Sequence, residues 1–253
     1  MRLGLVTYNL APDWDLDTLI TACEATGFEG VELRTTHGHG VEPTLDAAAR
    51  KAVRDRFAQT DVVLWGLGST CEYHSPDPDE VRRNIQTTCE FVDLARDVGA
   101  RGVKVRPNGL PKEVPAEQTL RQIGEALSEC GDYAGEEGIE IWLEVHGRET
   151  SHVPHIHTIM EIADHPAVKV CWNSNDADVV DGSIEENFDL LKSRIGSVHM
   201  RDLYLRDYPW HELFAGLKSI SYEGFCLAEL HPPSPDPERI MRYYEGLWRA
   251  LTA

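Results

Sequence analysis

The chain has 253 residues, and its 43 acidic residues outnumber its 24 basic ones, which gives a formal net charge of −19. This excess of negative charge disfavours binding to nucleic-acid phosphates, which requires a basic footprint. The hydrophobic content of 42% is ordinary for a soluble globular protein. No run of about 18 apolar residues is present, so the sequence predicts no membrane span.

The cysteines indicate a reducing compartment. Six are scattered along the chain without a Cys-x-x-Cys pair, as is typical of reduced thiols in a cytoplasmic protein. The opening "MRLGLVTYNLAPDWD" has one basic residue and an apolar run too short for a signal peptide. We therefore expect a cytoplasmic location.

Taken in chain order, the pattern predicts eight short apolar strands separated by helices. The strands cover residues 3–8, 30–33, 62–67, 102–106, 140–144, 168–172, 195–199 and 224–229. The helical stretches near 183–191 and 209–218 are the shortest. Strict alternation of strand and helix predicts a parallel sheet, and about eight such units in a chain of this length favour a closed (β/α)8 barrel.

Helix boundaries support this assignment. Helices are expected to end at Gly27, Gly99 and Gly138, because glycine readily adopts the left-handed conformation that terminates a helix. Asp77 and Asp236, each followed by proline, are predicted N-caps. No glycine-rich phosphate loop follows the first strand, where "TYNLAPDWD" stands, so a dinucleotide-binding fold is disfavoured. With no linker visible, residues 1–253 are expected to form one domain.

Polar side chains gather where the predicted strands end. Five strands end in a polar pair spaced by two, which places both members on the same side of the strand. These pairs are Glu32 and Arg34, Lys104 and Arg106, Glu144 and His146, His199 and Arg201, and Glu229 and His231. In a barrel all of them would meet at one mouth, where such crowding is costly unless the groups pair or bind a metal or a polar ligand. The sequence therefore predicts a site there.

A mixed set of donors is available for a metal at this mouth. Glu144, His199 and Glu229, with Asn173 at the end of the sixth strand, offer carboxylate, imidazole and amide groups. This set suits one divalent cation, Mg²⁺ or Mn²⁺ in the first place, with Zn²⁺ as an alternative.

From "GLVTYNL" to "FCLAELHP" the sequence resembles the xylose isomerase-like barrel superfamily, which contains sugar and sugar-phosphate isomerases and epimerases. In that family a Glu, an Asp, a His and a Glu on strands five to eight hold one divalent metal. The resemblance places them at Glu144 in "WLEVHG", Asn173 in "CWNSND", His199 in "SVHMRD" and Glu229 in "LAELHP".

The sixth strand departs from the family pattern. The family usually has Asp-Thr-Gly-His or a close relative there, whereas this chain has Asn173-Ser-Asn-Asp176. An amide oxygen can bind a hard cation but carries no charge, so we expect weak metal binding or a barrel that has lost its metal. The family's apurinic-site endonucleases are excluded, because "RDYPWHEL" replaces their Asp-x-His after strand seven.

The resemblance implies a metal-assisted isomerase or epimerase that acts on a sugar-like hydroxy-carbonyl compound, with Glu144 and Glu229 moving the proton next to the carbonyl. A dehydratase or lyase on a polyol derivative and a non-catalytic carbohydrate-binding barrel remain alternatives. The oligomeric state stays open, with a homo-oligomer allowed. The cations among the remaining polar residues either bind substrate oxygens or neutralise nearby glutamates. The residues expected to bind substrate are Arg34, Lys104, Arg106, His146, Asp176, Arg201 and His231.

Overall fold

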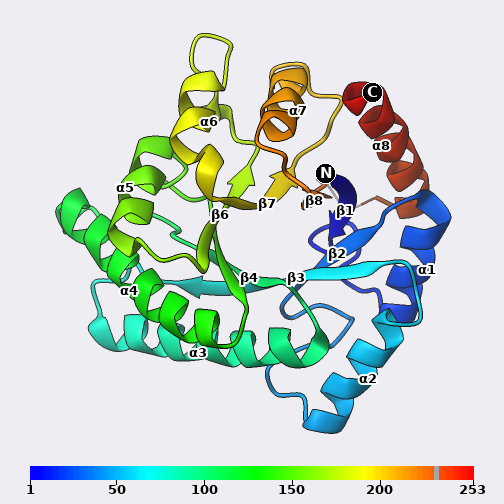
Figure 1. The fold of residues 1–253 in the computed structure, drawn as a ribbon, viewed down its shortest axis with the longest axis horizontal. Coiled ribbons are helices and arrows are strands. Elements are labelled where there is room, and N and C mark those ends of the chain that lie inside the picture. The colour runs from blue at the N-terminus through cyan, green and yellow to red at the C-terminus, as the bar shows by residue number, and fades with distance from the viewer. Residues whose placement is uncertain (231–233) are drawn as a thin grey trace.

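Eight parallel strands form a closed barrel in which each strand pairs with the next and β8 pairs with β1 (Figure 1). The structure is a computed structural model, and it describes residues 1–230 and 234–253. The strands are β1 (Arg2–Val6), β2 (Gly30–Arg34), β3 (Val63–Glu72), β4 (Gly102–Arg106), β5 (Glu140–Glu144), β6 (Val168–Asn173), β7 (Ile195–Met200) and β8 (Phe225–Ala228). The predicted fold class, a (β/α)8 barrel, is confirmed.

The largest difference from the predicted strands concerns β3. It continues to Glu72 instead of ending at residue 67, because a register shift after Gly68 restores pairing between Glu72 and Arg106 of β4. This extension brings another acidic side chain, that of Glu72, to the carboxyl end of the strands.

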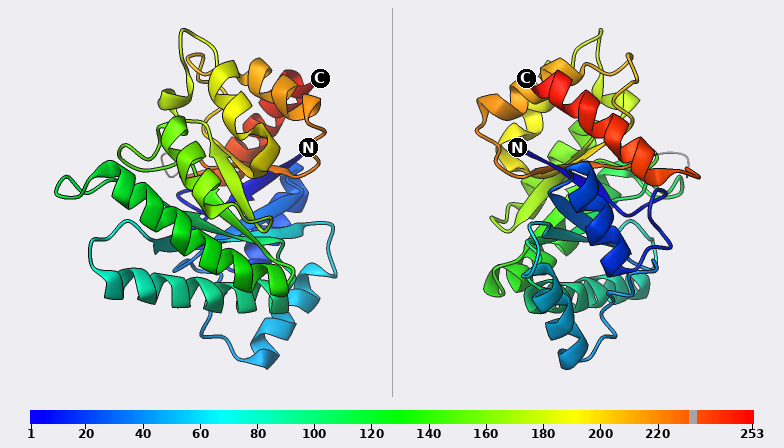
Figure 2. Two further views of the ribbon diagram at one scale, coloured as in Figure 1. Left: turned by 60° about the vertical axis from the view of Figure 1, so that its left-hand side comes forward. Right: turned by 90° about the vertical axis from the view of Figure 1, so that its right-hand side faces the viewer.

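Helices surround the barrel and follow the strands in order. Asp77 and Asp236 cap their helices as predicted, each accepting a hydrogen bond from a backbone N–H of the first turn. Gly27 and Gly99 end theirs in the left-handed region, with φ of 79° and 85°. The last helix lies beside the first and completes the ring (Figure 2). The helices are α1 (Leu16–Thr26), α2 (Ala47–Phe57), α3 (Pro78–Val98), α4 (Ala116–Glu136), α5 (Val153–Ala163), α6 (Glu185–Leu191), α7 (Trp210–Ser219) and α8 (Pro237–Thr252), with short 3-10 turns η1 (Asp176–Asp178) and η2 (Lys192–Arg194).

Large aromatic side chains fill the interior of the barrel on the side away from the carboxyl ends of the strands. Trp65 stacks on Trp142 with ring centroids 5.4 Å apart and packs against Phe225 at 5.1 Å. Gly30 and Gly102 make room for them, since a Cβ at these positions would lie 2.4 Å from the Phe225 ring and 2.5 Å from the Trp142 ring. Because these aromatic side chains fill the part of the barrel near the amino ends of the strands, the polar side chains lie at the carboxyl ends. Within the described residues, no helix is long and apolar enough to cross a membrane.

Candidate functional site

Four of the predicted site residues lie at the ends of neighbouring strands. Glu144 ends β5, Asn173 ends β6, and His199 is the penultimate residue of β7. Glu229 follows directly after β8, where its backbone N–H donates to the carbonyl of Met200. Asn173 and His199 are register partners, so parallel pairing brings these side chains to one mouth of the barrel.

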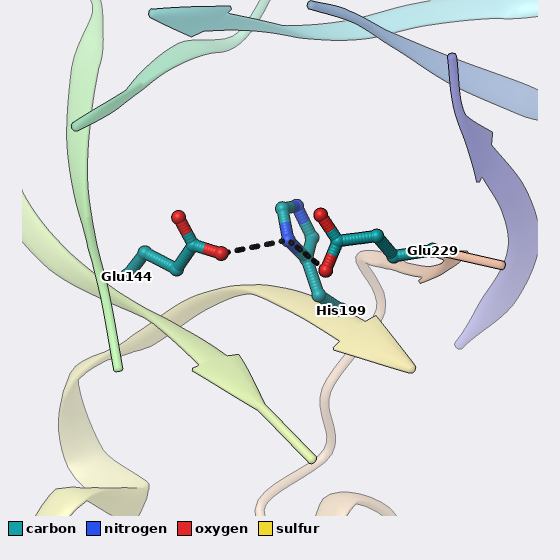
Figure 3. A group of neighbouring side chains, drawn as sticks. All are labelled: Glu144, His199 and Glu229. Atoms are coloured by element: carbon teal, nitrogen blue, oxygen red, sulfur yellow. Dashed lines mark ion pairs between the residues drawn. The ribbon is translucent and has the colours of Figure 1, made fainter. Parts of the chain in front are cut away.

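Glu144, His199 and Glu229 surround a common point (Figure 3). Nδ1 of His199 lies 3.6 Å from Oε1 of Glu144 and 3.9 Å from Oε2 of Glu229, and the two glutamates approach the ring from opposite sides. Each residue offers one ligand atom, and these atoms lie within 4.8 Å of one another. Two carboxylates and one imidazole at this spacing form a donor set for one divalent cation.

Glu32 fixes the orientation of the His199 ring. Its Oε2 lies 3.0 Å from Nε2 of His199, and both side chains are fully buried. An ionised carboxylate only accepts hydrogen bonds, so Nε2 carries a proton and donates it. Nδ1 is buried, has no hydrogen-bond partner among the described residues, and faces Glu144 and Glu229. A carboxylate behind one ring nitrogen is the usual support for a histidine that binds metal through the other, so these residues fit a divalent cation.

Sequence reasoning assigned no role in this site to Glu32. Its place in the Glu32 and Arg34 pair at the end of β2 was a visible signal. The partner, however, lies 167 positions further along the chain, and only closure of the barrel brings the two together.

Asn173 turns its amide nitrogen toward Glu144. Nδ2 donates to Oε1 of Glu144 over 3.3 Å, and the side chain is buried. For the predicted role of a neutral metal ligand, the amide would have to rotate and present its oxygen. In the orientation found here, Asn173 holds the carboxylate of Glu144.

Lys104 reaches the same carboxylate from β4. Its Nζ lies 2.9 Å from Oε2 of Glu144 in a buried ion pair. Burial alone would lower the pKa of Lys104, but the charges of Glu144 and Glu32 outweigh it and raise the pKa, so the ammonium stays charged. Both oxygens of Glu144 therefore accept hydrogen bonds from protein donors. The predicted role of Lys104 was substrate binding, and its observed partner is a glutamate of the site.

The two glutamates have opposite electrostatic environments. Burial would raise the pKa of Glu144, but the Lys104 ammonium and His199 hold that pKa well below its usual range. Burial raises the pKa of Glu229, and the charge of Glu144 adds to this against the opposing effect of His199. Glu144 therefore stays ionised, whereas Glu229 takes up a proton more readily. Carboxyl groups with separated pKa values suit one fixed charge and one proton carrier.

Two of the predicted substrate-binding arginines have carboxylate partners. Arg106 pairs with Glu72 of β3, and Arg201 pairs with Asp176 at 2.5 Å. Asp176 itself is largely exposed. The Arg106–Glu72 pair corresponds to the neutralisation of a glutamate that the sequence left open for the cations, whereas Arg201 pairs with another residue predicted to bind substrate.

The other predicted substrate-binding residues that the structure describes have weaker contacts with Glu144, His199 and Glu229. Arg34 donates to the carbonyl of Thr35. The ring of His146 is about half exposed, and its Nδ1 lies 4.0 Å from Oε1 of Glu144. His231 lies outside the described residues.

Asp178 is a buried acid beside the site that sequence reasoning missed in favour of Asp176. The hydroxyl of Tyr208 and the backbone N–H of Asn175 donate to its Oδ2 over 3.1 and 2.9 Å. Its Oδ1 has no hydrogen-bond partner among the described residues. Burial raises the pKa of Asp178 to about 8. The sequence shows two aspartates two residues apart, and only the 3-10 turn η1 decides which one points inward.

Comparison with solved structures shows close likeness of fold at low sequence identity. D-psicose 3-epimerase from Clostridium cellulolyticum H10 with D-tagatose is 16% identical, with a TM-score of 0.83 over 100% of this chain and 99% of that one. The IolI protein with a bound zinc atom is 16% identical, with a TM-score of 0.79 over 100% and 96% of the two chains. The probable 3-DHS dehydratase AsbF from Bacillus anthracis is 12% identical, with a TM-score of 0.78 over 98% and 99%.

The sequence itself gives a family assignment. A search of the curated proteins found no match. The model of the xylose isomerase-like TIM barrel family matches residues 20–247. This range is nearly the whole chain and includes Glu144, Asn173, His199 and Glu229. The chain therefore belongs to the xylose isomerase-like TIM barrel family.

Proposed function

We propose that the protein is an isomerase or epimerase that moves a proton on the carbon next to the carbonyl of a sugar or sugar derivative. The observation that carries this proposal is the placement of Glu144 and Glu229 on opposite sides of His199, whose Nδ1 has no hydrogen-bond partner in the described part of the chain. Proton removal next to a carbonyl requires a base on one face of the substrate and stabilisation of the oxygen that becomes negative. Epimerases among the structural neighbours support the same class of reaction.

Glu144, His199 and Glu229 would hold one divalent cation, with Asn173 beside them. When bound, such an ion supplies Lewis-acid polarisation of the substrate oxygens. The zinc atom in the IolI structure supports a metal in this fold. Mg²⁺, Mn²⁺ and Zn²⁺ all accept this donor set.

Glu229 is the better proton carrier of the two glutamates. Its side chain is 22% exposed at the mouth, whereas that of Glu144 is 4% exposed and bonded at both oxygens. In our proposal Glu229 removes the proton. Return of this proton by Glu229 to the neighbouring carbon, with transfer of the hydroxyl proton to the carbonyl oxygen, gives isomerisation. Delivery of a different proton to the original carbon from the opposite face, while Glu229 keeps the first, gives epimerisation.

Solvent deuterium exchange tests this function and does not require that the product be identified. The protein, loaded with Mg²⁺, Mn²⁺ or Zn²⁺, is incubated in D₂O with a panel of ketoses and aldoses, and ¹H NMR follows loss of the C–H signal next to the carbonyl. Exchange with at least one sugar is expected. Absence of exchange across the panel with all three ions would contradict the proposal.

The same incubations, with ultraviolet absorbance as a second readout, distinguish this function from a dehydratase and from a carbohydrate-binding barrel without catalysis. A dehydratase begins with the same proton removal but forms a double bond, which ultraviolet absorbance detects; the likeness to AsbF supports this option. A carbohydrate-binding barrel without catalysis would bind a sugar and exchange no proton. The hydrogen bonds that Glu144 accepts at both oxygens favour this second alternative, because they hold the carboxylate in place without a metal.

A further inference from the structure

Lys104 and Asn173 act on one carboxylate. The ammonium of Lys104 contacts Oε2 of Glu144, and the amide nitrogen of Asn173 contacts Oε1. Both contacts are buried, so neither partner is exchanged easily for water. The two residues come from different strands, β4 and β6, that lie on either side of β5.

These two residues change the charge of the centre in the same direction. With His199 in the neutral form that binds a metal through Nδ1, the carboxylates of Glu32, Glu144 and Glu229 and the ammonium of Lys104 carry a combined charge of −2, which a divalent cation would neutralise. A carboxylate at position 173 and an uncharged residue at 104 would leave the same centre at −2 with the cation bound. The chain therefore makes the loaded centre more positive by two charges, within a few ångströms of the donor atoms.

A more positive centre has opposite effects on the binding of a cation and the binding of an anion. It repels a cation and attracts an anion, and both effects are strong where water is excluded. In the proposed reaction, negative charge moves from Glu229 to the substrate oxygens as the proton moves the other way. An interaction that strengthens only when this charge has moved accelerates the reaction, whereas a tightly held cation alone does not.

We infer that Lys104 and Asn173 set the charge of the centre so that it gives up affinity for the divalent cation and gains affinity for an anionic ligand with two adjacent oxygens. This inference rests on the proposed function, because the natural ligand of that description is the enediolate formed by proton removal. Lys104 acts here as a fixed positive charge and Asn173 as a neutral residue in a position suited to a carboxylate.

The test measures two binding constants in the same variants. Isothermal titration gives the affinity for Mn²⁺, and a second titration gives the affinity of the Mn²⁺-saturated protein for acetohydroxamate, a planar anion with two adjacent oxygens. Lys104→Met removes the positive charge at similar length, and Asn173→Asp adds a negative charge at similar volume. Lys169→Met, near the start of β6, removes a lysine at the other end of the strand that Asn173 ends and is the matched control.

Both site variants are expected to bind Mn²⁺ at least about tenfold more tightly and acetohydroxamate at least about tenfold more weakly than the wild type, with the control unchanged. Opposite shifts identify a charge effect, because a damaged site would weaken both ligands. If Lys104→Met and Asn173→Asp weaken both ligands or change neither, the inference is overturned, and the two residues only hold Glu144 in place.

The same titrations distinguish failure of the proposed cation site from failure of the inference about charge. If neither the wild type nor Asn173→Asp binds Mn²⁺, the cation of the proposed function is removed together with this inference. If the wild type binds Mn²⁺ but the opposite shifts are absent, only the inference about charge falls, and the exchange experiment with sugars stands.

Discussion

Glu229 combines partial exposure at the mouth with a raised pKa, and Glu144 has neither property. In Glu229→Gln the amide keeps the shape and one oxygen but cannot accept a proton at neutral pH. We expect the rate of deuterium exchange to fall by about 10²-fold or more, with the melting temperature nearly unchanged. Glu125→Gln on α4, an exposed position, is the control. A Glu229→Gln variant with close to full exchange would show that another group removes the proton.

Glu32 is expected to control metal affinity without contacting the metal. In Glu32→Gln the side chain still accepts a hydrogen bond from Nε2 of His199, but the negative charge behind the ring is lost. Affinity for Mn²⁺ measured by titration is expected to fall about 10- to 100-fold. An unchanged affinity would mean that His199 is oriented by packing alone.

At Asn173 the prediction from the sequence and the structure differ in the rotation of the side-chain amide. The resemblance placed Asn173 at the site, and its side chain does lie against Glu144. The direction of its amide was not predictable, because it depends on Lys104 having taken the other oxygen of Glu144. Contacts of this kind join three strands and leave no local pattern in the sequence.

Among the elements, strands were easier to predict than the turns that follow them. Apolar runs ended by polar pairs marked β4, β5 and β7 closely, since buried parallel strands need continuous apolar side chains. The extension of β3 to Glu72 was not predicted, because residues 68–72 lack that apolar run and owe their pairing to β4. The 3-10 turn η1 was likewise not predicted, so the buried Asp178 was missed.

The turn η1 is expected to make stability depend on pH. Because the pKa of Asp178 is raised from 3.8 to about 8 in the folded protein, the folded state binds this proton more tightly than the unfolded chain does. The free energy of unfolding therefore decreases as pH rises from about 4 to about 8, by an amount on the order of a few kcal/mol. Asp178→Asn removes the charge and keeps an acceptor oxygen for Tyr208 and Asn175.

Chemical denaturation at pH 5 and pH 8 checks this expectation. The variant should gain stability over the wild type at pH 8 and gain little at pH 5. Asp176→Asn, which changes the exposed aspartate of the same turn, should show no such difference. A gain that is equal at both pH values would show that Asp178 is ionised throughout this range.

On the scale of the whole molecule, composition and alternation were enough to predict the barrel, because about eight strand–helix units fit one closed architecture at this length. The resemblance then supplied the strand ends at which to look, and the family match spans them. What neither supplied is the electrostatic state of the centre, since Glu32, Lys104 and Glu144 are far apart in sequence and meet only inside the closed barrel.

Metal binding is expected to stabilise the entire barrel. The donor atoms of Glu144, His199 and Glu229 come from β5, β7 and the end of β8, so they assemble only in the folded state. A cation at about 100 times its dissociation constant then adds about 2.7 kcal/mol to the free energy of unfolding, which corresponds to a rise of about 5 to 10 °C in melting temperature. Because the net charge of −19 also attracts cations to the surface, thermal unfolding with Mn²⁺ must be compared between the wild type and His199→Asn. The wild type should show a saturable rise that His199→Asn lacks, and an equal rise in both proteins would assign the stabilisation to the acidic surface instead of the site.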